Sequence, residues 1–175
     1  MLMASHNIMC RREYPHFYEN VDIIRMNSPY YSEEELIDIL ERDNTPKFID
    51  INIKVRLKQK KQNHDFYKLL KLIGKYNVDW IGISNVEDYK LYDYIRSILD
   101  NDKIKICAKI ETELGCWHAD DIMMSFDGIM VDTEDLAFQM GWKRTIEEKD
   151  RIYKECEKKN IPHFRLVGTI FEYKE

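Results

Sequence analysis

The sequence predicts an α/β protein in which a parallel sheet is covered by helices. Short apolar runs alternate with amphipathic stretches along the chain, which is the pattern of repeated strand–helix units. The runs at 104–110 and 128–131 are mostly apolar on both faces and are soon followed by charged residues, as buried parallel strands are. Seven segments have the features of strands: 6–10, 21–26, 47–53, 79–84, 104–110, 128–132 and 163–170.

Helices are expected between these strands, and several carry a start signal. Ser32 and Glu35 have the spacing of a capping box, as do Thr145 and Glu148. Asn85 can cap a further helix, because its side-chain oxygen can accept a hydrogen bond from a free backbone N–H. The expected helices span 32–42, 65–76, 85–99 and 145–159.

Composition and charge narrow the class of protein. The 175 residues fit one domain, 1–175, and the net charge of −5 argues against binding to nucleic acid or to an anionic membrane. No apolar run approaches the ~20 residues that span a bilayer, and no signal peptide is visible. The four cysteines lack Cys-x-x-Cys spacing, which favours reduced thiols and a cytoplasmic protein. The basic run Lys54–Lys61 is a local exception to the negative net charge. The favoured interpretation is a solvated loop, and the alternative is a contact for phosphate or an acidic partner.

Charged residues follow two of the predicted strands. Glu111 comes directly after the strand at 104–110, and Asp135 follows the strand at 128–131. If these strands are neighbours, the two carboxylates converge and can share one hard cation, and Mg²⁺ prefers one or two protein carboxylates with substrate oxygens and water. Lys109 lies two residues before Glu111, so strand alternation points both side chains the same way.

The stretch 104–136 resembles the pyruvate kinase family, within the wider group of barrels that handle phosphoenolpyruvate and pyruvate. Lys109-Ile-Glu111 matches a Lys-Ile-Glu triplet that closes one strand of that family, and Asp127-Gly-Ile-Met-Val131 with Asp135-Leu136 matches a run that leads to its Gly-Asp-Leu turn. The resemblance implies that Glu111 and Asp135 hold Mg²⁺ or Mn²⁺. It also implies that Lys109 faces the enol oxygen or the transferring phosphoryl group.

The resemblance continues upstream. Val21–Asn27 is similar to a strand of the family that ends Arg-Leu-Asn, and Lys47–Asp50 to one that ends in Asp. The resemblance implies that Arg25 binds a phosphoryl group. It also implies that Asn27 helps to bind a monovalent cation in addition to the divalent metal. The candidate catalytic residues are Lys109 and Arg25. The candidate substrate-binding residues are Arg25, Asn27, Asp50 and Thr133.

The resemblance also implies the architecture, a TIM-type (βα) barrel. Because a complete eight-fold barrel typically takes about 250 residues, we expect a minimal or incomplete barrel of about seven parallel strands, without a lid or C-terminal domain. Its first and last strands would leave unpaired edges, so we expect a homo-oligomer or a partner chain that covers them. One departure stands out: the family has Ala-Arg-Gly where this chain has Asp132-Thr133-Glu134, and loss of the Gly hinders close approach of the backbone to substrate.

These residues predict a Mg²⁺- or Mn²⁺-dependent enzyme. It would act on a small anionic 2-oxo acid or its enol phosphate, such as pyruvate, phosphoenolpyruvate or oxaloacetate, through a metal-stabilised enolate, as a pyruvate kinase-like transferase. Two alternatives stay open. The segment after Asp135 is also similar to metal-dependent 2-keto acid aldolases and citrate-lyase-type enzymes, so the same enolate could serve a lyase. The chain could also be a degenerate barrel that acts as a binding or structural subunit.

Overall fold

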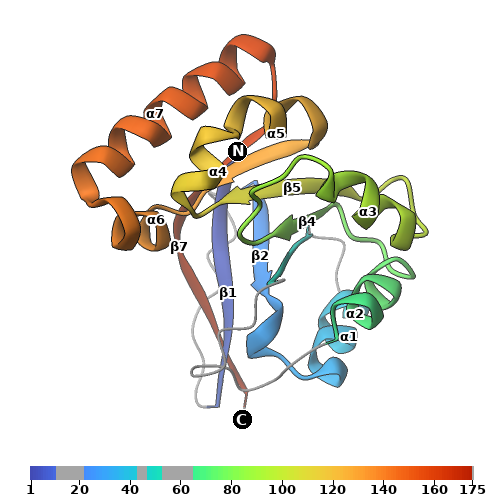
Figure 1. The fold of residues 1–175 in the computed structure, drawn as a ribbon. Coiled ribbons are helices and arrows are strands. Elements are labelled where there is room, and N and C mark those ends of the chain that lie inside the picture. Colours follow the sequence, from blue (N-terminus) through green and yellow to red (C-terminus); the bar gives the residue numbers. More distant parts are fainter. Residues whose placement is uncertain (11–21, 43–46, 53–64, 175) are drawn as a thin grey trace.

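The strands of this protein form one closed barrel (Figure 1). The computed structural model describes residues 1–10, 22–42, 47–52 and 65–174. Within them all seven expected strands are present, parallel and arranged in chain order. They are β1 (Leu2–Cys10), β2 (Ile23–Asn27), β3 (Lys47–Ile51), β4 (Trp80–Ile83), β5 (Lys105–Ile110), β6 (Gly128–Val131) and β7 (His163–Lys174). The prediction of a small parallel βα barrel is confirmed.

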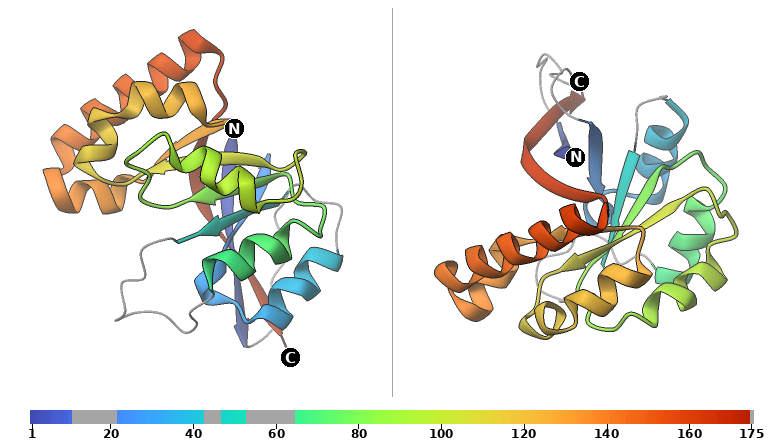
Figure 2. Two further views of the ribbon diagram at one scale, coloured as in Figure 1. Left: turned by 45° about the vertical axis from the view of Figure 1, so that its right-hand side comes forward. Right: turned by 90° about the horizontal axis from the view of Figure 1, so that it is seen from above.

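The barrel has no open seam between its first and last strands, so the expectation of unpaired edges was wrong. β1 pairs with β7 along its whole length, from Leu2 opposite Arg165 to Cys10 opposite Lys174. β1 begins at Leu2, earlier than the sequence suggested, and Met3 to Ser5 pair with β2 on the other side. The two long strands lie side by side in Figure 1 and in the left view of Figure 2. Because β1 and β7 pair with each other, no partner chain is needed to cover a free edge of either strand.

Helices lie on the outside of the barrel and leave part of β7 uncovered (Figure 2). A short helix, η1 (Ser28–Tyr30), follows β2. The α-helices are α1 (Glu33–Arg42), α2 (Phe66–Ile73), α3 (Leu91–Ile98), α4 (Glu113–Trp117), α5 (Ala119–Ser125), α6 (Thr133–Met140) and α7 (Trp142–Lys159). The capping box at α1 is confirmed, because the N–H of Glu35 donates to the Ser32 hydroxyl and the N–H of Ser32 donates to the Glu35 carboxylate, both at 3.0 Å.

Two expected helix starts were wrong. Asn85 has a left-handed backbone (φ +57°), and α3 begins only at Leu91. Thr145 is not a cap but a buried residue inside α7, which begins at Trp142. The chain turns at Gly141 (φ +80°), which separates α6 from α7 four residues before the predicted cap, Thr145.

The barrel interior begins with an apolar layer to which every strand contributes one side chain. These residues are Met3, Ile23, Phe48, Trp80, Cys107, Met130 and Phe164. The ring of Phe164 makes edge-on contacts with Phe48 and Trp80, with centroids 5.1 and 4.8 Å apart. A larger apolar cluster fills the space between strands and helices. The interior layer closes one end of the barrel, so a polar site can form only toward the carboxyl ends of the strands.

Gly82 is part of this interior packing. A Cβ atom there would lie 2.2 Å from the ring of Phe48. We expect Gly82→Ala to lower the free energy of unfolding by about 1–3 kcal/mol, because an overpacked core forces shifts of side chain and backbone. Chemical denaturation measures the effect, and Gly74→Ala is the matched control because its nearest heavy atom is 3.4 Å from the added Cβ. Equal stability of the two variants would contradict the packing described for Gly82.

The basic run Lys54–Lys61 lies outside the described residues. Among the helices that are described, none is both long and apolar enough to cross a membrane.

Candidate active site

A polar layer lies directly above the apolar one. Arg25, Asp50 and Lys109 each follow an interior apolar residue of the same strand by two positions, so alternation turns them inward as well. All three are buried. Buried charges must be paired and hydrogen-bonded, so the contacts of this layer decide what it can do.

Lys109 is the centre of the polar layer. Its Nζ lies 2.8 Å from Asp50 Oδ2 and 2.6 Å from Glu111 Oε1, and it donates to the Ser84 hydroxyl at 3.3 Å. Burial alone would lower the pKa of Lys109, but the carboxylates of Asp50 and Glu111 outweigh burial and raise it. The ammonium group is therefore charged throughout the physiological pH range.

Arg25 and Lys109 share the carboxylate of Asp50. Arg25 Nε donates to Asp50 Oδ2 at 2.8 Å and Nη2 donates to the same oxygen, while Nη1 donates to the Ser5 hydroxyl at 3.1 Å. Burial would raise the pKa of Asp50, but the two cations outweigh it and lower this pKa to about 2. Asp50 thus orients both cations toward the same end of the barrel.

Loss of the Asp50 charge should destabilise the fold. We expect Asp50→Asn to cost about 3–5 kcal/mol of unfolding free energy at neutral pH, because two buried cations lose their shared partner. The lowered pKa adds a pH signature. The wild type is stabilised by Asp50 above about pH 4 and loses about 2 kcal/mol of this contribution as the pH falls toward 2.

Urea denaturation between pH 2 and 7 measures both effects. Asp93→Asn, which removes an exposed carboxylate of α3, serves as the control. An Asp50→Asn protein as stable as wild type at pH 7 would refute the role given to this carboxylate.

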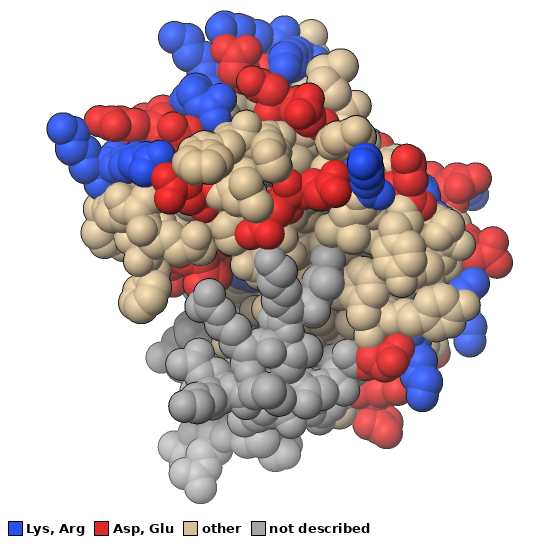
Figure 3. All heavy atoms as spheres, viewed as in Figure 1, with Lys and Arg blue, Asp and Glu red and all other residues tan. Residues whose placement is uncertain are grey.

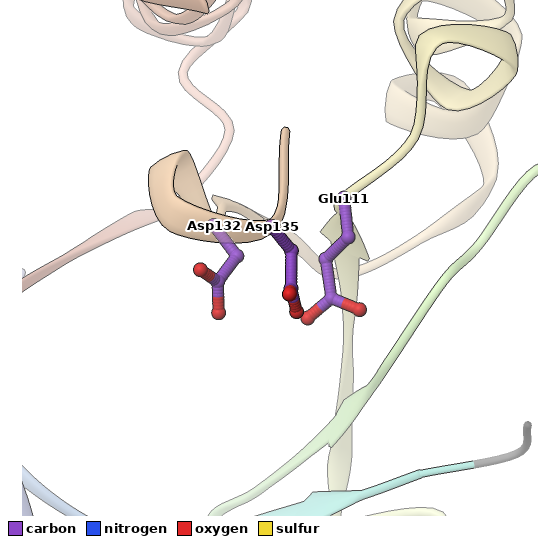
Figure 4. A group of neighbouring side chains, drawn as sticks. All are labelled: Glu111, Asp132 and Asp135. Carbon is purple, nitrogen blue, oxygen red and sulfur yellow. The ribbon is translucent and has the colours of Figure 1, made fainter. Parts of the chain in front are cut away.

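Three carboxylates gather at the carboxyl ends of β5 and β6 (Figure 4). Glu111 follows β5, while Asp132 and Asp135 come from the start of α6, and one oxygen of each lies within 4.8 Å of the others. Figure 4 shows all three side chains pointing to the same side of the strand ends. The structure thus brings together Glu111 and Asp135, as expected from β5 and β6 being neighbours.

Asp132 was missed by the sequence reasoning. It directly follows β6, and its Oδ2 lies 3.6 Å from Lys109 Nζ. A signal was available: Asp132 is two residues beyond Met130, which belongs to the interior layer, so alternation turns it inward.

Glu111 is nearly enclosed, with 2% of its surface exposed. Its Oε2 accepts a hydrogen bond from the N–H of Asn85 at 2.9 Å, and the left-handed backbone of Asn85 positions that donor. Burial raises the pKa of Glu111 to about 7, against the opposing pull of Lys109 and with help from the neighbouring Asp50. A carboxylate in this position favours an additional positive charge nearby.

The donor set fits a hard divalent cation. All of its ligands are carboxylate oxygens, and they belong to residues at the ends of neighbouring elements. The carboxylates face an open cavity, in which substrate and water can complete the coordination of the metal. No His or Cys belongs to the group, so the site fits Mg²⁺ or Mn²⁺ better than Zn²⁺.

These groups line a cavity of about 1050 Å³ at the carboxyl ends of the strands. All seven candidate residues from the sequence reach it: Arg25, Asn27, Asp50, Lys109, Glu111, Thr133 and Asp135. Tyr30 also lines the cavity, whereas its neighbour Tyr31 is buried in the outer core. Ser84, Asn85 and Asp132 are lining residues that the sequence reasoning had not assigned to the site. In Figure 3, acidic side chains form a band across the middle of the face shown.

Comparison with known families agrees with this geometry. Residues 50–164 match the family described as pyruvate kinase, barrel domain. The chain belongs to this family. The matched region contains Asp50, Lys109 and the three clustered carboxylates, while Arg25 and Asn27 precede it. A comparison with curated proteins finds no match.

Proposed function

We propose that this pyruvate kinase-type barrel is a Mg²⁺- or Mn²⁺-dependent enzyme that stabilises the enolate of a small 2-oxo acid or of its enol phosphate. One observation carries the proposal: a buried, charged lysine stands beside three clustered carboxylates at the floor of a large cavity. Lys109 contributes a charge to this site rather than apolar packing. A fixed cation beside carboxylates that would bind a metal suits a reaction in which negative charge develops on an oxygen atom of the substrate.

Glu111, Asp132 and Asp135 would hold the metal. When bound, a divalent ion supplies Lewis-acid stabilisation of the negative charge that develops on the 2-oxo oxygen. The protein contributes the position of these carboxylates: the Asn85 N–H orients Glu111, and Lys109 separates Glu111 from Asp50.

Lys109 would place its charge against the developing enolate oxygen. Asp50 and Ser84 hold its ammonium group in one position, so little reorganisation is needed when the substrate's charge changes. Arg25 would orient the carboxylate or phosphoryl group of the substrate, because a planar guanidinium suits both. Asn27 and Thr133 lie on the cavity wall, where they can hydrogen-bond the substrate.

Two reactions share this enolate. Phosphoryl transfer is the chemistry suggested by the family, and cleavage or formation of a carbon–carbon bond is the alternative. A non-catalytic role is the second candidate, and one observation favours it: Lys109 and Arg25 already have carboxylate partners within the fold. In that role the polar layer would only hold the strand ends together.

Exchange of the methyl protons of pyruvate with solvent tests the proposal. Enolisation removes a proton from the methyl carbon and solvent returns one, so NMR in D₂O follows the reaction without knowledge of the second substrate. We expect exchange that depends on Mg²⁺ or Mn²⁺ and is inhibited by oxalate, which mimics the enolate. Absence of exchange with pyruvate and oxaloacetate, and of any reaction of phosphoenolpyruvate, would favour the non-catalytic role.

A further inference from the structure

The pairing of β6 with β7 is interrupted at the level of the cavity. Within the described strands these two share two register pairs, and the second is Met130 opposite Phe164. The N–H of Ile129 donates to the carbonyl oxygen of Pro162 at 2.9 Å. Such bonds recur every second residue in a parallel ladder, so the N–H of Val131 is expected to donate next to the carbonyl oxygen of Phe164.

The hydroxyl group of Tyr153, a residue of α7, takes the place of that bond. The N–H of Val131 donates to this hydroxyl at 3.2 Å, and the hydroxyl donates to the carbonyl oxygen of Phe164 at 2.8 Å. All three residues are buried. The Tyr153 ring lies 4.9 Å from the ring of His163 and 5.4 Å from the Arg165 guanidinium, the two neighbours of Phe164 in β7. The hydroxyl is therefore a fixed part of the barrel wall.

On its other side, β6 stays paired with β5 to its end. Val131 lies opposite Ile110, and the N–H of Asp132 donates to the carbonyl oxygen of Ile110 at 3.1 Å. Glu111 directly follows Ile110, so this pairing brings Asp132 close to Glu111. Tyr153 lines the cavity although α7 lies outside the barrel (Figure 2). The end of β6 thus parts from β7 and remains with β5.

We propose that Tyr153 is a positioning residue for the carboxylates that would bind the metal. By replacing a ladder bond, its hydroxyl ends the β6–β7 pairing directly before Asp132, so that the start of α6 can bring Asp132 and Asp135 to Glu111. The inference rests on the proposed function. It adds a residue that acts through the backbone of β6 rather than by contact with the metal.

Removal of the hydroxyl in Tyr153→Phe tests this role. The N–H of Val131 then either loses its partner or bonds directly to Phe164, and in both cases the end of β6 shifts or loosens relative to β5. Groups that hold metal ligands in place typically contribute about 10- to 100-fold to metal affinity. Because Tyr153 acts through the backbone, we expect the lower end of this range. Calorimetry should show Mn²⁺ binding about tenfold weaker than in the wild type.

Tyr92→Phe is the matched control, because it removes a hydroxyl from the opposite end of the same strand. The Tyr92 hydroxyl lies 3.4 and 3.5 Å from the two carboxylate oxygens of Asp127, which directly precedes β6. This variant should keep its Mn²⁺ affinity within about twofold. Unchanged affinity in Tyr153→Phe, or an equal loss in Tyr92→Phe, would overturn the positioning role alone. A wild type that binds no Mn²⁺ would overturn the proposed function and this inference with it.

A second measurement uses the wild type and needs no folded variant. NMR follows the exchange of the Val131 amide proton with D₂O, with and without Mg²⁺. A bound ligand suppresses the openings of the protein that disturb its site. If the bond to Tyr153 maintains the metal-binding arrangement, Mg²⁺ at about 100 times its Kd should slow this exchange at least about tenfold. A Val131 exchange rate that does not respond to bound Mg²⁺ would overturn the proposal, even if Tyr153→Phe did not fold.

Discussion

Replacement of Lys109 by Met is expected to abolish enolisation while the protein stays folded. The methionine side chain keeps an apolar stem of similar length but removes the charge opposite the developing enolate oxygen. Loss of one preorganised charge costs on the order of 3 kcal/mol, a factor of about 10² to 10³ in rate. Asp50 keeps Arg25 as its partner and Glu111 keeps the Asn85 N–H, so the carboxylates stay in place.

Methyl-proton exchange of pyruvate gives the rate, and calorimetry with Mn²⁺ shows whether the metal site survives. Lys105→Met is the matched control, because it makes the same replacement on the same strand at the exposed, opposite end. If Lys109→Met exchanged protons as fast as wild type, the lysine would be a structural ion-pair partner and no more.

Removal of the clustered carboxylates is expected to have the second large effect. Glu111→Gln and Asp135→Asn should each weaken Mn²⁺ binding about 100-fold or more, which corresponds to about 3 kcal/mol. Each substitution keeps the size of the side chain and removes a charged oxygen ligand. Asp132→Asn should weaken binding less, because Asp132 is also 3.6 Å from Lys109 and shares its charge with that cation.

Calorimetric titration with Mn²⁺ measures these affinities. Asp121→Asn removes an exposed acidic residue at the start of α5 and should leave the affinity unchanged. Unchanged Mn²⁺ affinity in both Glu111→Gln and Asp135→Asn would remove the metal site from the account.

The strands and the inward polar layer could be predicted from the sequence. Buried parallel strands are mostly apolar runs, and their period of two carries Lys109 and Glu111 to the same side without any knowledge of the fold. The neighbouring positions of β5 and β6 then bring Glu111 close to Asp135. These features depend on local sequence patterns, which is why the sequence alone was enough to predict them.

The closure of the barrel could not be predicted in the same way. The pairing of β1 with β7 joins residues more than 160 positions apart, and no local pattern reports such a contact. The start of α3 was wrong for a related reason: Asn85 has a left-handed backbone, and its N–H donates to Glu111 at the end of the neighbouring strand β5, a contact that no local pattern reports. Asp132 had a local signal in its position after β6, because it lies two residues beyond the inward-facing Met130.

The location of a bound metal and enolate analogue tests the central claim most directly. A crystal grown or soaked with Mn²⁺ and oxalate would show the metal by its anomalous scattering. We predict one Mn²⁺ coordinated by Glu111 and Asp135, with oxalate between the metal and the Lys109 ammonium group. A strong Mn²⁺ peak elsewhere, or oxalate bound away from Lys109 while these carboxylates hold no metal, would contradict the account.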